Sequence, residues 1–209
     1  DYVIVEKGFE QKLIDAVKKE LKKQYGKAPL SSRDYGNIVN LRHLKRLESY
    51  LENVNVVYGG ELDESRPAMA PTLVLEPSLD SPLMKEEIFG PILPIITVDN
   101  MEAGIKFVNS RPKPLALYAF SDKDDVLDNI ISKTSSGSVC TNDTMLFMTN
   151  PELPFGGVGN SGMGSYHGQA GFDTFSHIKT VMKRSFALDV FFRYAPFSKF
   201  KLSLLKKFL

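Results

Sequence analysis

The sequence contains one cysteine, Cys140, only three histidines and no long apolar run. A single cysteine excludes an internal disulfide framework, and scattered histidines lack the ligand spacing of a zinc site. We therefore expect a reducing compartment and no metal. The chain also lacks a signal peptide and any run of about 18 apolar residues, so it predicts no membrane-spanning helix.

Charge of either sign is not in excess, because 26 Lys and Arg stand against 25 Asp and Glu. This balance gives no basic excess for nucleic acid, and we expect no nucleic-acid partner. With 209 residues, 43% of them hydrophobic, the chain is typical of a soluble globular protein of one large domain or slightly more. It starts at Asp1, inside an apparent strand and without an initiator methionine, so we expect a piece of a longer protein.

The hydrophobic pattern predicts alternating strands and helices. Residues 2–6 predict a strand, and residues 9–25 an amphipathic helix that ends at Gly26. A second helix is predicted from Ile38 to Leu51, and residues 61–71 are predicted to be a polar loop. The remaining predicted strands cover residues 54–60, 72–76, 94–98, 115–120 and 137–142, with helices at 101–111 and 122–136. This order predicts an α/β fold with a mostly parallel sheet.

The glycine-rich stretch "PFGGVGNSGMGSYHG" contains a G-x-G-x-x-G pattern at Gly157, Gly159 and Gly162. A dinucleotide-binding turn should follow a buried strand, open a helix and lead to an acidic residue about 20 positions later. Here Pro151 and Pro154 precede the glycines, and prolines cannot donate to a central ladder. The pattern therefore favours a glycine-rich crossing segment over a pyrophosphate site.

Ligands of open α/β sheets collect beyond the carboxyl ends of the strands. That rule directs attention to three loops, at residues 84–92, 140–145 and 154–160. In the first loop, a carboxylate of the Glu86–Glu87 pair suits the paired hydroxyls of a ribose, and Phe89 suits a flat heterocycle. The residues alone leave another interpretation open, in which the two glutamates are solvated and Phe89 belongs to the core.

Four motifs, taken together, carry a resemblance to a known family. They are "EEIFGPILPI", "NSRPKPLALYAFS", "SSGSVCTND" and "LPFGGVGNSGMGSYHGQAGFDTFSHIKTV". In this order and spacing they resemble the aldehyde dehydrogenase superfamily, and "GMGSYHG" and "FDTFSH" are similar to its class 3 and fatty-aldehyde branch. The resemblance runs from Asp1 to about Arg184. It implies a partial catalytic domain over 1–155, a return segment and oligomerisation strand over 156–186, and an amphipathic tail over 187–209.

The resemblance also implies site residues. Glu87 would accept hydrogen bonds from the nicotinamide ribose of NAD or NADP, and Phe89 would pack beside that ribose. Asn142 and Phe155 would shape the substrate pocket, with His167 near it. His43 and His177 are interpreted as structural.

No residue of this chain is expected to be catalytic. Cys140 lies inside an apolar strand pattern, whereas a nucleophilic cysteine must be accessible in an environment that lowers its pKa, so Cys140 is interpreted as structural. In the family the nucleophilic cysteine precedes the strand that residues 1–6 resemble. We therefore expect that cysteine, the general-base glutamate and the Rossmann-like cofactor domain upstream of Asp1.

The implied function is oxidation of medium or long aliphatic, or aromatic, aldehydes to carboxylic acids through a cysteine thiohemiacetal and thioester. The fragment alone would be inactive. An alternative of a different class is a non-catalytic binding or scaffolding module that keeps the sheet and the dimer surface.

The C-terminal part predicts partners and location. The strand near Lys179–Ser185 is expected to pair in a homodimer, because an exposed edge strand needs a cover. In the tail, one predicted helical face carries Phe200, Leu204, Leu205 and Phe208. Three alternatives remain open for it: a helix over the mouth of the substrate channel, a helix on a membrane surface, or disorder. The expected location is cytoplasmic, with peripheral membrane contact through this tail as the further alternative, and a hydrophobic anchor follows such a segment in some relatives.

Overall fold

A four-stranded sheet forms the base of the computed structural model, which describes residues 1–187 and 189–208. Strand β1 (Val3–Glu6) lies beside β6 (Ile92–Val98), which lies beside β5 (Thr72–Leu75), and both pairs are parallel. The edge strand β2 (Val56–Tyr58) joins β5 antiparallel. The predicted α/β fold with a mostly parallel sheet is confirmed.

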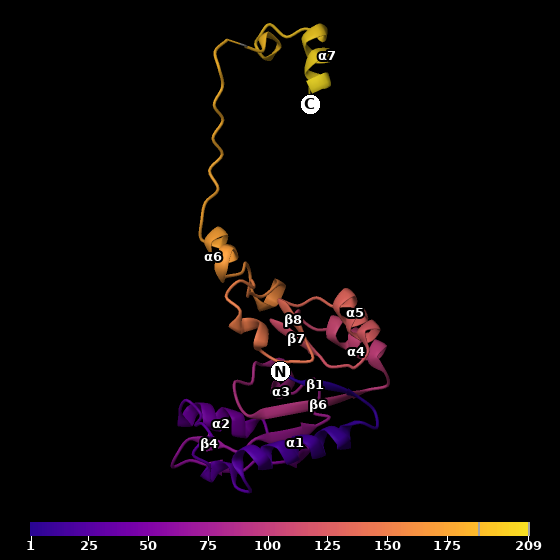
Figure 1. Ribbon diagram of the computed structural model, residues 1–209, viewed down its shortest axis with the longest axis vertical. Helices are drawn as coiled ribbons and strands as arrows, with labels where there is room; N and C mark the ends of the chain where they lie inside the picture. Colours follow the sequence, from indigo (N-terminus) through magenta and orange to yellow (C-terminus); the bar gives the residue numbers. More distant parts are fainter. Residues whose placement is uncertain (188, 209) are drawn as a thin grey trace.

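Helices cover both faces of this sheet (Figure 1). Helix α1 (Glu10–Tyr25) packs Ile14 against one face, which is formed by alternate residues of β5 and β6. Helix α2 (Leu41–Ser49) and the short α3 (Pro82–Lys85) cover the opposite face, where Leu44 and Leu47 of α2 are almost fully buried. Successive strand residues point to opposite faces, so the apolar strands supply two cores at once.

A second, two-stranded sheet follows in the chain. Strands β7 (Ala116–Ala119) and β8 (Ser138–Thr141) are parallel, and helix α5 (Asp124–Lys133) connects them. Helix α4 (Met101–Asn109) packs Ile105 against α5 and also lies close to β1, since a Cβ at Gly104 would be 3.5 Å from the Ile4 side chain. Helix α4 therefore links the two sheets.

Residues 61–71 are not the polar loop that their composition predicts. They form a hairpin of β3 (Leu62–Asp63) and β4 (Ala68–Met69), and Met69 is fully buried in the cluster beneath α2. The loop prediction was wrong because a short Ala-Met-Ala run, surrounded by polar residues, is enough to anchor a hairpin. The helix predicted from Ile38 is also shorter, because the side chain of Asn40 accepts a hydrogen bond from His43 N and caps α2.

Beyond β8 the chain forms only short elements. These are the 3₁₀ turns η2 (Leu146–Thr149), η3 (Gly159–Ser161) and η4 (Phe191–Arg193), and the helices α6 (Gly168–Thr174) and α7 (Lys199–Phe208). A further 3₁₀ turn, η1 (Pro29–Ser31), follows α1. After α6, up to residue 187, the chain runs away from the body (Figure 1).

The strand predicted near Lys179–Ser185 is not present in the part of the chain that the structure describes. Ile178 and Met182 there are 85% and 83% exposed. A strand exists only when its backbone pairs with a neighbour, and none of the described segments pairs with this backbone in a ladder. The strand pattern of the sequence is therefore not realised as a strand ladder among the described residues.

Helix α7 lies far from both sheets (Figure 1). It packs on η4, where Lys201 Nζ donates a hydrogen bond to Tyr194 O at 2.9 Å. No helix among the described residues is both long and apolar enough to cross a membrane. Leu188, Leu209 and the side chain of Phe208 lie outside the described residues. The channel-cover and membrane-surface alternatives stay predictions.

Tyr35 fastens the connection between α1 and α2 to the hairpin. Its hydroxyl donates a hydrogen bond to Met69 O at 2.6 Å, and its ring meets that of Tyr25 edge to face, with the ring centroids 5.0 Å apart. Burial, and after it the charge that Tyr25 acquires on ionisation, raises the pKa of Tyr35 from 10.0 to about 12.

This shift predicts a loss of stability in alkali. Because the folded chain holds the Tyr35 proton more tightly than the unfolded chain, the stabilisation is complete below pH 10.0 and is lost as the pH rises toward about 12. Between about pH 9 and pH 11, where Tyr35 begins to titrate, the unfolding free energy should fall less in Tyr35→Phe than in the unsubstituted protein. Urea unfolding at both pH values measures the difference. The exposed Tyr194→Phe is the control, and equal losses in all three proteins would contradict the prediction.

Candidate functional site

The loop that connects α3 to β6, residues 86–91, lies at the amino edge of the sheet. It precedes β6, which is parallel to β1, so it meets the beginning of β1, where Ile88 N donates a hydrogen bond to Asp1 Oδ2 at 2.8 Å. The expectation that this loop lies beyond carboxyl ends was wrong. That rule concerns segments that follow parallel strands, and this loop leads into one.

Within the loop, one buried residue separates two exposed ones. Ile88 is 1% exposed and belongs to the cluster that includes Leu44 and Leu47 of α2. Glu87 is exposed, and Phe89 is 72% exposed with a backbone φ of +47°. The interpretation of Phe89 as a core residue is therefore wrong. Burial of Ile88 directs Glu87 and Phe89 outward.

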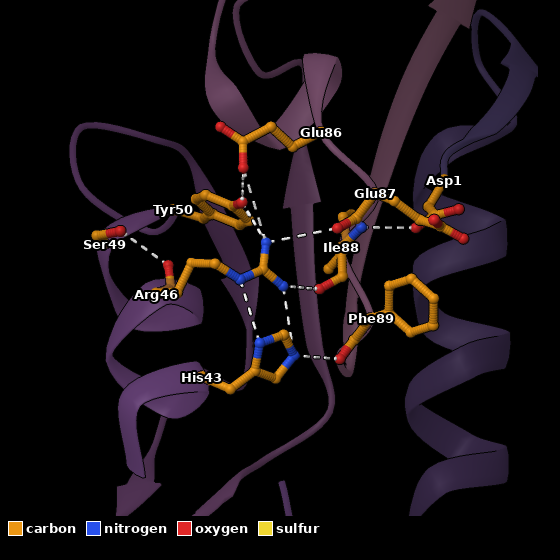
Figure 2. Close-up of polar contacts among 9 residues, drawn as sticks. All are labelled: Asp1, His43, Arg46, Ser49, Tyr50, Glu86, Glu87, Ile88 and Phe89. Atoms are coloured by element: carbon orange, nitrogen blue, oxygen red, sulfur yellow. Dashed lines mark hydrogen bonds and ion pairs between the residues drawn. The ribbon is translucent and has the colours of Figure 1, made fainter. Parts of the chain in front are cut away.

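Two side chains of α2 bind the backbone of this loop (Figure 2). Arg46 Nη2 donates to Ile88 O at 2.5 Å, and Arg46 Nη1 donates to Glu87 O at 3.4 Å. The distance from His43 Nε2 to Phe89 O is 2.9 Å. Three consecutive carbonyl groups are thus held from one helix, and we call Arg46 and His43 the clamp.

The two side chains of the clamp also contact each other. Arg46 Nε donates to His43 Nδ1 at 3.2 Å, so Nδ1 is an acceptor. Arg46 Nη2 lies 3.3 Å from His43 Nε2, the same nitrogen that lies 2.9 Å from Phe89 O. The interpretation of His43 as a structural residue did not anticipate this contact with the site loop, and Arg46 was missed altogether.

Tyr50 separates the two neighbouring glutamates. Its hydroxyl donates to Glu86 Oε2 at 2.6 Å and accepts a hydrogen bond from Arg46 Nη1, whose guanidinium lies over the Tyr50 ring (Figure 2). Burial, followed by the hydrogen bond to Glu86, raises the pKa of Tyr50, so the hydroxyl stays a donor at neutral pH. Glu86 is thereby held beside α2, whereas the side chain of Glu87 is exposed.

The second set of predicted residues lies around β8. Asn142 directly follows β8 with a φ of +56°, and its side-chain oxygen accepts a hydrogen bond from Ser121 N at 2.9 Å. Its own N–H donates to Ala119 O at 2.8 Å. Asn142 is exposed and ties together the carboxyl ends of β7 and β8.

Phe155 and His167 belong to a group of rings. Phe155 and Tyr166 exchange two backbone hydrogen bonds of 2.9 Å, and the ring of His167 stacks on that of Phe155 at 6.0 Å. The Nδ1 atom of His167 is buried and has no hydrogen-bond partner. We call the group the aromatic cluster; its members are Tyr118, Phe147, Phe155, Tyr166 and His167.

The glycine-rich stretch next to this cluster is tightly folded. A Cβ at Gly157 would lie 2.1 Å from Ser161 O, so glycine is needed for a close crossing of the backbone. No strand leads into these glycines, and α6 starts only at Gly168. The crossing-segment interpretation fits this geometry. Cys140 is partly buried within β8, and His177 is exposed.

Residues 1–181 match the aldehyde dehydrogenase family. This chain belongs to that family. It is 46% identical over 210 residues to aldehyde dehydrogenase family 3 member F1 of Arabidopsis thaliana, covering 99% of this chain and 43% of that protein. It is 45% identical over 185 residues to the dimeric NADP-preferring aldehyde dehydrogenase of Rattus norvegicus, covering 88% and 41%. The chain therefore spans less than half the length of these relatives.

Solved aldehyde dehydrogenases share the fold. A substrate-bound structure of Staphylococcus aureus AldH matches with a TM-score of 0.87 and 44% identity, covering all of this chain and 46% of that one. A Mycobacterium tuberculosis aldehyde dehydrogenase in complex with NAD⁺ matches with a TM-score of 0.76 at 23% identity, covering 90% and 40%, which shows the fold alone. The predicted resemblance to the family is confirmed.

Ile88 should be the residue on which the shape of the site loop depends. We expect Ile88→Ala to lower the unfolding free energy by about 2–5 kcal/mol, because it leaves a cavity beneath α2. Ile88→Val should cost about 0.5–1.5 kcal/mol. Urea denaturation measures both values, and equal stability of the two variants would contradict the assigned burial.

Proposed function

We propose that the protein containing this chain oxidises aldehydes to carboxylic acids with NAD or NADP. The observation that carries the proposal is the pair of exposed side chains, Glu87 and Phe89, on either side of the buried Ile88 in a member of this family. The chain supplies the nicotinamide-ribose side of the site and part of the pocket wall.

The residues of the loop fit a nicotinamide ribose. The exposed carboxylate of Glu87 offers two acceptor oxygens for paired ribose hydroxyls, and the exposed ring of Phe89 offers an apolar face. The nicotinamide, when bound, accepts the hydride that leaves the aldehyde carbon. Both cofactors are kept in the proposal because the rat relative is named NADP-preferring, whereas the Mycobacterium tuberculosis structure contains NAD⁺.

The aromatic cluster, with Asn142 beside the strand ends, supports an apolar substrate. Phe155 and its neighbours present rings that suit medium or long aliphatic, or aromatic, aldehydes. In this proposal the nucleophilic cysteine and the general-base glutamate come from outside these 209 residues, because Cys140 is partly buried in the β8 strand. These 209 residues alone would then not oxidise an aldehyde.

Glu87→Gln in the full-length dehydrogenase tests this assignment. Gln keeps the size of the side chain but replaces one acceptor oxygen with a donor, so the nicotinamide is held less well over the reacting carbon. We expect hydride transfer to slow by about 10- to 100-fold. Stopped-flow measurement of reduced cofactor in the first turnover reports this step, with Glu48→Gln on α2 as control. An unchanged rate would favour the alternative of a non-catalytic binding module.

The proposal includes a homodimer formed through residues 179–185. The segment lies in no strand ladder, its residues are exposed, and the rat relative is named dimeric. Cytoplasmic location, with α7 at a membrane surface as the alternative, belongs to the same proposal and is supported by the exposed Phe200 and Leu202 beside basic residues.

Proline substitutions test the dimer. Successive N–H groups of a strand point to opposite edges, so only one of the two substitutions, proline at Thr180 or proline at Val181, removes a donor from the pairing edge. We expect one of the two variants to raise the dimer dissociation constant about tenfold or more. Sedimentation velocity measures it, with Val181→Thr as the control that keeps the N–H. Unchanged dimers in both proline variants would exclude pairing through this segment.

A further inference from the structure

We propose that Arg46 and His43 are positioning residues that hold the backbone of residues 87–89, so that Glu87 and Phe89 face the nicotinamide ribose. The inference rests on the proposed function, because it concerns the same site. It adds two residues that never need to touch the cofactor.

The first step of the argument is that the loop carbonyls have donors from a single helix. Residues three apart on a helix share a face, so His43 and Arg46 reach the loop together. Between them they bind the carbonyl oxygens of Glu87, Ile88 and Phe89 in sequence. Residues 87–89 belong neither to α3 nor to β6, and the donors to their carbonyl oxygens are side chains of α2.

The second step is that the clamp is itself held in place. The side chain of Arg46 is 30% exposed, and its guanidinium donates to His43 Nδ1, to the Tyr50 hydroxyl and to the loop. A guanidinium is planar and has a fixed fork of donors, so its contacts determine one orientation. Lysine has a flexible stem and a compact ammonium group, and it cannot bind all three partners in that geometry.

The third step concerns the backbone of Phe89. A positive φ is unfavourable for an aromatic residue and persists only when the surroundings determine it. Here the carbonyl of Phe89 is bound by His43, and the next residue, Gly90, lies so close to α2 that a Cβ would be 2.5 Å from Leu47 Cδ1. This conformation places the ring of Phe89 outside the core, where the proposed function needs it.

The fourth step is the separation of two adjacent carboxylates. Tyr50 and Arg46 together engage Glu86, at 2.6 Å and 3.9 Å from its Oε2 atom. Glu87 is thereby left to face outward. Tyr50 and Arg46 thus hold Glu86 beside α2.

The test uses Arg46→Met, Arg46→Lys and the control Arg42→Met in the full-length dehydrogenase. Arg42 lies exposed on the same helix, so the control removes the same charge without touching the loop. Three quantities are measured: hydrogen exchange of the amides at 87–90, the dissociation constant of reduced cofactor by fluorescence, and the first-turnover hydride transfer rate.

For Arg46→Met we expect faster exchange at residues 87–90, a dissociation constant raised about tenfold and hydride transfer slowed about tenfold or more, because charge-assisted hydrogen bonds to the loop are lost. Arg46→Lys should recover only part of each effect, and Arg42→Met should match the unsubstituted protein. If exchange and affinity of Arg46→Met both match the unsubstituted protein, the inference is overturned. It is equally overturned if exchange rises while cofactor affinity and hydride transfer stay unchanged, since the clamp would then be structural only.

A second pair of variants keeps the test decisive if Arg46→Met does not fold. His43→Leu removes the side-chain group that binds Phe89 O, whereas His43→Gln retains an amide donor. Weaker cofactor binding and slower hydride transfer in His43→Leu, with recovery in His43→Gln, support the inference, and equal behaviour of the two variants overturns it. The outcome is separable from failure of the proposed function. If hydride transfer is slower in Glu87→Gln but unchanged in the clamp variants, only the inference about the clamp is rejected. If hydride transfer is unchanged in Glu87→Gln, the proposed function itself is rejected.

Discussion

Docking of the 86–91 loop on α2 is the constraint on which the candidate site depends. Ile88 enters a cluster that also holds β5, β6 and α2, so the loop and the sheet share one core. A shift of the loop by one residue would exchange inward and outward positions, burying Glu87 or Phe89 in place of Ile88. Burying an unpaired carboxylate is strongly unfavourable, which excludes the shift that would bury Glu87.

Much of this arrangement follows from sequence patterns. Short apolar runs predicted β1, β2, β5, β6, β7 and β8, and repeats of three or four residues predicted α1 and, with bounds that were too wide, α2. The exposed roles of Glu87 and Phe89 came from the family resemblance, since the residues alone left Phe89 open to a core interpretation. The clamp could not be found this way, because Arg46 lies 42 residues from Ile88 and binds backbone carbonyls, which any residue type provides. The edge on which the loop lies also required strand order, which composition does not contain.

The segment near Lys179–Ser185 shows a different limit. Its alternating residues favour extended structure, but a strand is completed by a neighbour's hydrogen bonds, and a sequence pattern cannot state whether that neighbour lies in the same chain. The hairpin at 62–69 failed for the opposite reason. Its partner is only a few residues away, and its apolar content is too small for composition to reveal, yet Met69 is fully buried.

The strain at Phe89 and the burial of Ile88 are parts of one balance. A non-glycine residue at positive φ costs on the order of 1–3 kcal/mol, whereas a buried isoleucine side chain contributes about 1.5–3 kcal/mol. Burial alone therefore roughly offsets the strain and leaves little to select one loop geometry. Directional hydrogen bonds from Arg46 and His43 supply that selection, because they bind the carbonyls only where this geometry places them. The imidazole of His43 joins the two parts of the clamp, since its Nδ1 accepts from Arg46 Nε while its Nε2 lies 2.9 Å from the carbonyl oxygen of the strained residue.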